Sequence, residues 1–115
     1  MRDADRVSRG GGAADRLGGL RDDVARLVEA VLEGKGTLSV EARQAAFAGR
    51  ADDPAVAGYL DVVRKHAFRV TDQDVEQLRA GGLNDDAIFE LTVAAALAAG
   101  VERLQVGLSL LGGEQ

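Results

Sequence analysis

The chain has 115 residues, which is enough for one domain with a single hydrophobic core and too few for two ordinary domains. Hydrophobic residues make up 46% and charged residues 29%, values that exclude a disordered chain. The absence of cysteine excludes disulfides and thiol chemistry, and a single histidine excludes multi-histidine metal centres. We therefore expect no metal and no cofactor. The net charge of -5 argues against nucleic acid or an anionic membrane as the main partner.

The first 19 residues combine arginine and aspartate with glycines at positions 10–12 and 18–19, and their only large apolar residues are Val7 and Leu17. Such a segment buries too little apolar surface to offset the entropy lost on ordering it. The pattern predicts a mobile tail over residues 1–19 and a folded domain over residues 20–115. The glycines match neither the dinucleotide-binding nor the P-loop spacing, which disfavours a phosphate-binding loop.

Nothing in the sequence predicts a membrane segment. Charged residues occupy the start of the chain, where a signal peptide needs an apolar stretch. The longest apolar run, residues 91–101, lies between Glu90 and Glu102 and is too short to span a bilayer. We therefore expect a cytoplasmic protein with no membrane partner.

Apolar residues recur at spacings of three and four from residue 20 onward, which predicts an all-α fold of about five helices. The first helix is expected from Leu20 to the glycines at positions 34 and 36. Its apolar face is formed by Leu20, Val24, Leu27, Val28, Val31 and Leu32. The second helix is expected from an N-cap at Ser39 to Gly49.

Capping residues mark the start of the remaining three helices. Pro54 follows two aspartates and suits the first helical position, where its missing N–H is not needed. Thr71, with Asp74 three residues later, predicts a capping box, and glycines 81 and 82 end that helix. Asn84 caps the last helix, which forms a C-terminal helical hairpin with the helix before it. The buried stripe of the third helix is expected at Val56, Tyr59, Leu60, Val63 and Ala67.

The last predicted helix contains an alanine-rich stretch, residues 94–99, followed by Gly100. Small side chains let another helix approach closely, so the stretch is either a central packing seam or a subunit interface. Gly100 costs about 1 kcal/mol relative to alanine in a helix interior. Because the apolar pattern resumes in phase after Gly100, we expect the helix to continue through it.

Residues 59–111 contain a sequence motif that also occurs in a known group of proteins. Residues 71–88 read as T-x-x-D-V-x-x-L-x-x-G-G-L-N-D-x-x-I, inside the longer matching segments 61–75 and 78–91, and Arg103, Leu104 and Leu108 match the late part of the same pattern. This half of the chain resembles the carboxymuconolactone decarboxylase and alkylhydroperoxidase-D-like superfamily. The resemblance implies a helical bundle of that type and an oligomer packed through related helices.

One departure from this family bears on function. Redox-active members carry a Cys-x-x-Cys pair, with a glutamate upstream and a histidine downstream, whereas this chain has no cysteine. Since the thiolate is the attacking group, we expect no thiol peroxidase activity. Two functions follow from the resemblance. We favour a non-redox oligomeric structural or interaction module, and the alternative is a decarboxylase or lactone-type enzyme acting on a small organic acid.

His66 is the only histidine and the first candidate for acid–base chemistry near neutral pH. It follows Val63 by three residues, beside the apolar stripe, which favours a structural histidine that is either hydrogen-bonded or half-buried. In the enzyme hypothesis, His66 and Arg69 are catalytic and form a carboxylate-binding site with Arg64 and Lys65. Cations near the end of a helix also complement its dipole, which explains the cluster without a ligand. An enclosed pocket holding His66 and a cation would favour the enzyme.

The last helix is apolar on more than one side. Its large apolar residues spread around more than half of its circumference, so a single core stripe does not cover all of them. They are Leu91, Val93, Leu97, Val101, Leu104, Val106, Leu108, Leu110 and Leu111. Because an exposed patch of this size promotes aggregation, we expect a homo-oligomer, at least a dimer, with residues 94–111 in the interface. Ala96 and Gly100 are expected at that interface.

Overall fold

The computed structural model describes the backbone of residues 9–112 and the side chains of residue 16 and residues 18–111. This part of the chain contains five α-helices, one 3₁₀ turn and no strand. The elements are α1 (Arg9–Glu33), α2 (Val40–Phe47), α3 (Pro54–His66), η1 (Ala67–Arg69), α4 (Asp72–Ala80) and α5 (Asp85–Gly112). The all-α fold of about five helices is therefore confirmed.

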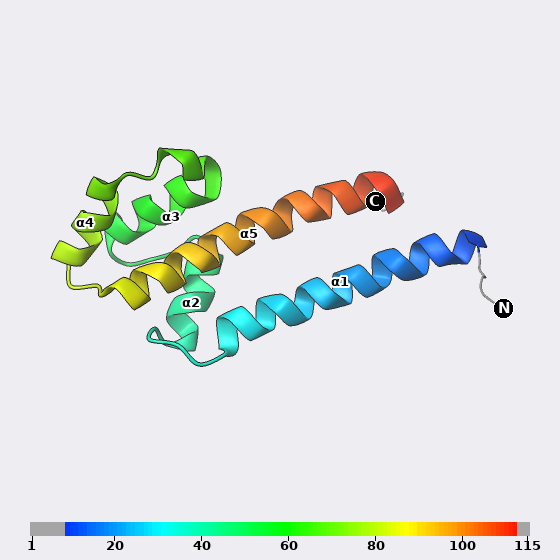
Figure 1. The fold of residues 1–115 in the computed structure, drawn as a ribbon, viewed down its shortest axis with the longest axis horizontal. Helices are drawn as coiled ribbons and strands as arrows, with labels where there is room; N and C mark the ends of the chain where they lie inside the picture. Colours follow the sequence, from blue (N-terminus) through cyan, green and yellow to red (C-terminus); the bar gives the residue numbers. More distant parts are fainter. Residues whose placement is uncertain (1–8, 113–115) are drawn as a thin grey trace.

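Two long antiparallel helices, α1 and α5, project away from a cluster formed by the shorter helices (Figure 1). We call the projecting part, residues 9–28 and 101–112, the arm, and the remainder of the described chain the head. The molecule measures 60 × 27 × 22 Å and its radius of gyration is 18.0 Å. A compact chain of this length has a radius of gyration of about 13 Å. The arm therefore gives the molecule its elongated shape.

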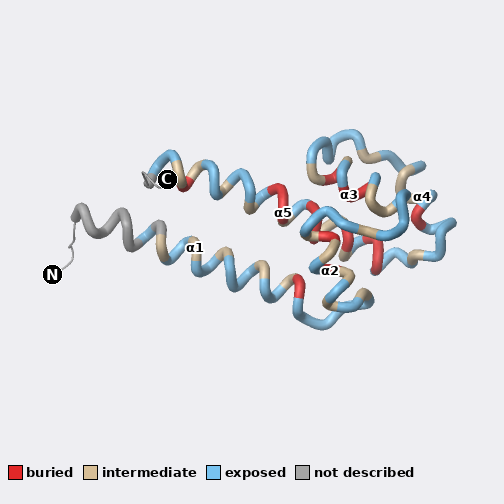
Figure 2. The backbone as a smooth tube through the Cα atoms, turned by 180° about the vertical axis from the view of Figure 1, so that it is seen from behind, coloured by how far each residue is buried: buried red, intermediate tan, exposed pale blue. Residues whose placement is uncertain are grey.

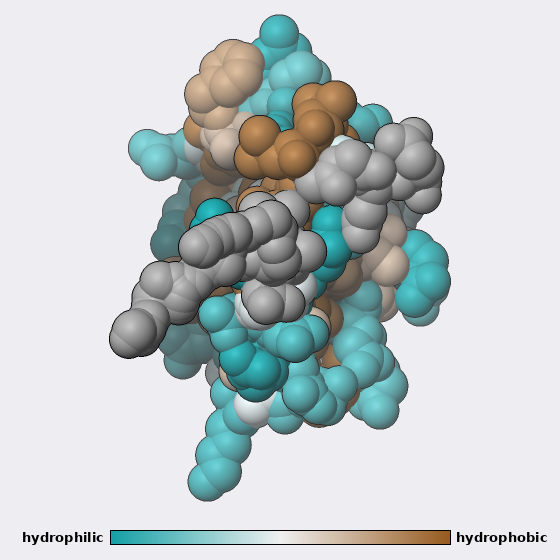
Figure 3. All heavy atoms as spheres, turned by 90° about the vertical axis from the view of Figure 1, so that its right-hand side faces the viewer, coloured by the Kyte–Doolittle hydropathy of each residue, from teal (hydrophilic) through white to brown (hydrophobic). Residues whose placement is uncertain are grey.

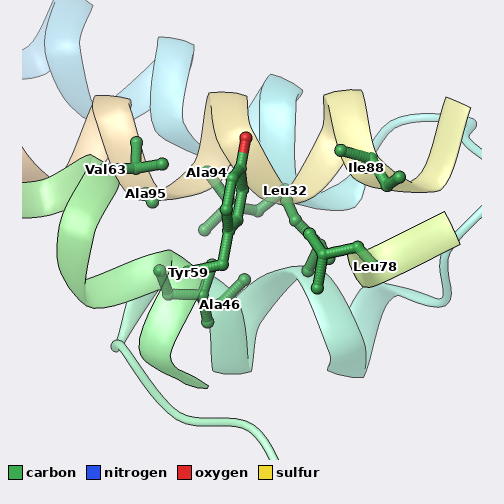
Figure 4. Packing of buried hydrophobic residues seen from close by; sticks show 10 residues of the cluster. Leu32, Ala46, Tyr59, Val63, Leu78, Ile88, Ala94 and Ala95 are labelled. Carbon is green, nitrogen blue, oxygen red and sulfur yellow. The ribbon is translucent and has the colours of Figure 1, made fainter. Parts of the chain in front are cut away.

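The hydrophobic core lies in the head, where α5 packs against α2 and α3. Tyr59 and Leu60 of α3 lie at its centre, and Ala94 of α5 has no exposed surface (Figure 4). Buried residues gather in this region, whereas most of the arm is exposed or half-buried (Figure 2). The other members of the core cluster are Leu32, Ala46, Val63, Leu78, Ile88, Leu91 and Ala95.

The alanine-rich stretch of α5 forms a packing seam inside the chain. Ala94, Ala95, Ala98 and Ala99 are all buried against the head. Small side chains at these positions let α5 lie close to α2 and α3, which is the first of the two alternatives for this stretch. The helix runs without interruption through Gly100, as predicted.

The predicted helix caps are present. Thr71 Oγ1 accepts a hydrogen bond from the backbone N–H of Asp74 (3.2 Å), and the Asp74 carboxylate accepts one from the N–H of Thr71 (2.9 Å), which completes the capping box. Asn84 Oδ1 accepts the N–H of the residue three positions later at 2.8 Å. Ser39 and Asp53 cap α2 and α3 by accepting backbone N–H groups in the same way.

Helix α1 begins at Arg9 rather than at Leu20. Residue 20 is therefore not a boundary of secondary structure, and one helix joins part of the predicted tail to the predicted domain. The glycines weaken this helix by about 1 kcal/mol each but still form its backbone hydrogen bonds. Leu17 extends the spacing of Leu20 and Val24 towards the N-terminus, which favours a longer helix. Residues 1–8 of the predicted tail lie outside the described residues.

The end of α3 also differs from the expectation. The helix stops at His66, and the next residue, Ala67, starts the η1 turn and is exposed rather than buried. The predicted stripe is correct at Tyr59, Leu60 and Val63, which are buried. Because the chain leaves the helical path at His66, the three-and-four spacing no longer points later residues at the core.

Candidate functional site

His66 and Arg69, the two residues of the enzyme hypothesis, lie at the surface beyond the end of α3, and both are exposed. Phe68 lies between them. Its ring centroid is 6.0 Å from that of His66, in an edge-on arrangement, and 5.7 Å from the guanidinium carbon of Arg69. The latter contact is a cation–π interaction. Phe68 is itself 82% exposed, so this cluster faces solvent.

The expectation of a half-buried His66 is therefore wrong. The reason is local, because α3 ends at His66 and the side chain is no longer held against the apolar stripe. None of the hollows described below is lined by His66 or Arg69. The structure brings the two residues together around an aromatic ring and does not enclose them, whereas substrate sites are usually concave pockets that bury most of the ligand.

Arg64 and Lys65 make contacts that account for their charges structurally. Arg64 donates to the backbone carbonyl of Phe47 at the end of α2 (3.2 Å) and forms an ion pair with Glu102 of α5 (2.8 Å). Arg64 thus links α3 to two other helices. Lys65 Nζ lies 3.0 Å from the Asp61 carboxylate, one turn earlier on the same helix. The basic cluster predicted near the end of α3 is divided between these two roles.

A carboxylate clamp at Glu90 joins α5 to the loop between α1 and α2. Glu90 accepts hydrogen bonds from the backbone N–H groups of Thr37 (2.6 Å) and Leu38 (2.8 Å). Arg43, which is buried on α2, donates to the carbonyl of Val31 in the last turn of α1 (3.0 Å). Its positive charge also acts on Glu90. These contacts fix the turn that sends the chain from the arm into the head.

This clamp was not predicted from the sequence. The signal in the sequence is a single carboxylate within the apolar stretch that follows the first turn of α5, between Phe89 and Leu91. A charge at such a position requires a partner once the helix is packed. The structure also gives a reason for glycine at position 36, because a Cβ atom there would lie 2.9 Å from the Glu90 carboxylate.

The clamp and the Arg64 ion pair both change a glutamate pKa. Partial burial acts to raise the pKa of Glu90, but the hydrogen bonds from Leu38 and Thr37 and the charge of Arg43 outweigh burial, so this pKa lies below the ordinary glutamate value. The hydrogen bond from Arg64, followed by its charge, lowers the pKa of Glu102. Both groups therefore favour the ionised form, the form suited to a structural ion pair rather than to a proton donor at neutral pH.

The one tyrosine has a structural hydrogen bond. Its hydroxyl lies 2.7 Å from Thr92 Oγ1 on α5, and Thr92 donates its own hydroxyl proton to the carbonyl of Ile88 at 2.7 Å. Tyr59 is therefore the donor to Thr92. Because Tyr59 is buried and this bond satisfies its hydroxyl, the residue supports the packing of α3 on α5 (Figure 4).

Mainly apolar hollows lie on the described surface of both the head and the arm. The first, of about 670 Å³, lies between α2 and α3 and has Arg50, Asp52 and Asp53 among its polar lining residues. The second, of about 510 Å³, lies between α1 and α5 in the arm. Its lining is mostly aliphatic, with Arg21 and Gln105 as the polar members, and Phe47 is also part of its wall. Neither hollow contains an acid–base pair matched to a nucleophile.

The arm carries large apolar side chains that the rest of the described chain does not cover. On α5, Val106 is 62% exposed, and Leu110 and Leu111 are each 81% exposed. On α1, Leu20 and Leu27 are exposed as well. Hydrophobic atoms gather in the upper half of the molecule when it is viewed from the end of the arm (Figure 3). This surface is the most distinctive feature of the described chain.

Among residues 9–112, no group of three or more histidine, aspartate or glutamate side chains is placed to hold a metal ion. Within the same described part, none of the helices has the length and apolar character needed to cross a membrane. No protein-family model matches the chain, and no curated protein and no solved structure is similar enough to it to count as a match. The resemblance of residues 59–111 to the alkylhydroperoxidase-like superfamily stays a prediction.

Proposed function

We propose that this protein is a non-redox, self-assembling helical module that binds a second copy of itself through residues 94–111 of α5, most of which lie in the arm. The observation that carries this proposal is the set of exposed apolar residues Val106, Leu110 and Leu111 on a helix pair that projects from the head. Moving one leucine side chain from water into an apolar contact stabilises a complex by about 1.5–3 kcal/mol. Several such side chains per copy give an interface a substantial driving force.

The charge distribution supports contact between two arms. The chain as a whole has a net charge of -5, which makes two copies repel. The arm has five arginines against four carboxylates over residues 9–28 and 101–112. The surplus of negative charge therefore belongs to the rest of the chain, and two arms approach each other without a large electrostatic cost.

The proposal includes descent from the alkylhydroperoxidase-like superfamily without its thiol centre, on the strength of residues 59–111 and the absence of cysteine. It also includes a cytoplasmic location, where a chain without disulfides is at no disadvantage. The decarboxylase alternative needs His66 and a cation inside a water-excluding pocket, and the exposure of both His66 and Arg69 does not support it.

Thermal unfolding at several protein concentrations tests the proposal. Because association stabilises the folded state by mass action, the midpoint temperature should rise with concentration between about 1 and 100 µM. Leu110→Asp in the arm should abolish this dependence. Phe68→Asp, at an equally exposed apolar residue in the head, should retain it. A wild-type midpoint that does not change with concentration would contradict the proposal, as would loss of the dependence in the Phe68 variant alone.

A further inference from the structure

Helix α5 has three faces: the first is buried in the head as far as residue 99, the second lies against α1 in the arm, and the third is not covered by the described chain. Ala94, Ala95, Ala98 and Ala99 pack into the head. Val101, Leu104 and Leu108 line the hollow shared with α1. The third face is formed by Ala96, Gly100, Arg103, Gly107 and Leu110, and we call it the outer stripe. Successive residues of an α-helix are rotated by about 100° around its axis. The centre of the outer stripe therefore lies about 110° around the helix from the second face and about 130° from the first.

The outer stripe has the spacing of a helix-packing surface. Its five residues follow one another at intervals of four, three, four and three, the repeat by which one helix presents a continuous seam to another. Ala96, Gly100, Arg103 and Leu110 are exposed and Gly107 is half-buried. Only one of the five positions is charged. A solvent-facing stripe on a surface helix is usually polar, so this composition indicates a covered face.

The stripe contains both notches and a projecting side chain. A Cβ atom added at Gly100 or at Gly107 would have no neighbour from the rest of the described chain within 4 Å, so each glycine leaves an open depression on the helix. Leu110 projects from the same stripe with 81% of its surface exposed. Large residues opposite small ones are the arrangement by which two helix surfaces interlock.

Resting on the proposed self-association, we propose that α5 packs antiparallel against α5 of a second copy, with Leu110 of each chain seated in the Gly100 notch of the other. Such a pair has a twofold axis beside Gln105. The same axis places Arg103 of each chain over Gly107 of the other. Each of the last four residues of the outer stripe therefore contacts a residue of the partner's outer stripe. Both notches are filled at once because the contact is symmetric.

Charge selects this register over its nearest competitor. Moving the axis by two residues, to Arg103, pairs Leu110 with Ala96 but places the two Arg103 guanidinium groups opposite each other. Like charges in contact destabilise a helix pair. With the axis beside Gln105, the aliphatic part of each Arg103 side chain lies over a glycine, and its charged end reaches solvent at the edge of the interface.

The shape of the molecule permits this pairing. In the proposed register, residues 98–112 of the two chains overlap over about 21 Å, at 1.5 Å per residue. Each partner helix continues beyond the tip of the other arm, so the two heads lie at opposite ends and do not collide. Helix α1 occupies the face of α5 that carries Val101, Leu104 and Leu108, and it leaves the outer stripe open.

Disulfide trapping tests the register, and the chain suits it because it has no cysteine of its own. Two variants, Gly100→Cys and Leu110→Cys, are mixed in equal amounts and oxidised mildly, and the products are resolved by mass. Since Gly100 of one chain faces Leu110 of the other, the mixed disulfide should exceed each same-variant disulfide at least fivefold. Two Gly100 residues, or two Leu110 residues, lie about 15 Å apart in this register, beyond the reach of a disulfide.

A second variant keeps the test independent of cysteine chemistry. Gly100→Leu fills the notch and should raise the dimer dissociation constant at least tenfold, with helix content unchanged. Gly58→Leu on α3 is the control and should leave the dissociation constant within twofold. If same-variant disulfides dominate while the unfolding midpoint still depends on concentration, the register is wrong and self-association stands. If neither disulfides above background nor a concentration-dependent midpoint is found, both proposals fail.

Discussion

The carboxylate of Glu90 accepts a hydrogen bond from the backbone N–H of Leu38 at a distance of 2.8 Å, across 52 positions of sequence. A second hydrogen bond from Thr37 completes a clamp that holds the turn after α1 against the start of α5. Because α5 runs as one helix from the core into the arm, the clamp ties the end of α1 to the start of that helix. The clamp therefore helps to hold α1 alongside α5 in the arm.

Glu90→Gln should lower the free energy of unfolding at pH 7 by about 1–3 kcal/mol, because a charged acceptor is replaced by a neutral one with a single suitable oxygen. Glu29→Gln, at an exposed residue of α1, is the matched control and should change stability by less than about 0.5 kcal/mol. Urea unfolding followed by circular dichroism measures both. Equal effects of the two substitutions would show that the clamp contributes nothing specific.

The same clamp gives stability a defined pH dependence. Since the pKa of Glu90 and that of Glu102 are lower in the folded protein than in an unfolded chain, the folded state binds fewer protons. Their contribution is complete above the unfolded glutamate pKa, about 4.3, and is lost as the pH falls through the lower folded values. Stability measured between pH 7 and pH 3 should therefore fall less steeply in Glu90→Gln than in the wild type. Identical slopes would contradict this account.

Gly36→Ala and Gly58→Ala should have opposite effects. A methyl group at Gly36 would lie about 2.9 Å from the Glu90 carboxylate, which two hydrogen bonds hold in place, so this change should destabilise the fold by about 1–2 kcal/mol. Gly58 lies in α3 with open space around it, so alanine there should stabilise by about 1 kcal/mol. Thermal unfolding midpoints compare the two. A stabilising Gly36→Ala would mean that the carboxylate moves aside freely.

Arg64→Met should lower stability by about 1–2 kcal/mol, because it leaves the part-buried Phe47 carbonyl without its donor. It should also return the pKa of Glu102 towards the ordinary glutamate value, which nuclear magnetic resonance titration detects. Lys65→Met removes an exposed ion pair of the same helix and should change stability by less than about 0.5 kcal/mol. A larger loss from the Lys65 change would reverse the roles assigned to the two cations.

The purified protein should not reduce alkyl hydroperoxides with any dithiol donor, because the attacking group in that reaction is a thiolate and the chain has no cysteine. A coupled assay against a heat-inactivated sample measures this. Turnover above that background in metal-free protein would contradict the expected loss of thiol chemistry.

The helices could be predicted from local sequence signals, but the contacts between residues far apart in the sequence could not. The capping box of Thr71 and Asp74 uses residues three positions apart, so their types alone indicate it. The partners of Glu90 lie more than 50 residues away, and nothing at Thr37 or Leu38 marks them as donors. The burial of His66 was predicted wrongly for a different reason. Spacing placed it beside the core, but the helix ends at that residue and the side chain faces solvent.

The proposed interface on α5 rests partly on the sequence and partly on the structure. Spreading apolar residues indicated that the helix needs cover on several sides, and Gly100 was placed at the contact. Which face stays open depends on how α1 and the head pack, and only the structure gives that arrangement. The role proposed for Gly107 depends on that arrangement, because Gly107 lies on the face of α5 that neither the head nor α1 covers.

Sedimentation equilibrium of the wild-type protein tests the central claim most directly, since it gives the molar mass in solution without reference to shape. From about 1 to 100 µM, the weight-average mass should rise towards twice that of the 115-residue chain, and Leu110→Asp should hold it at the single-chain value across the same range. A folded wild-type protein with the mass of one chain at every concentration would contradict self-assembly through the arm.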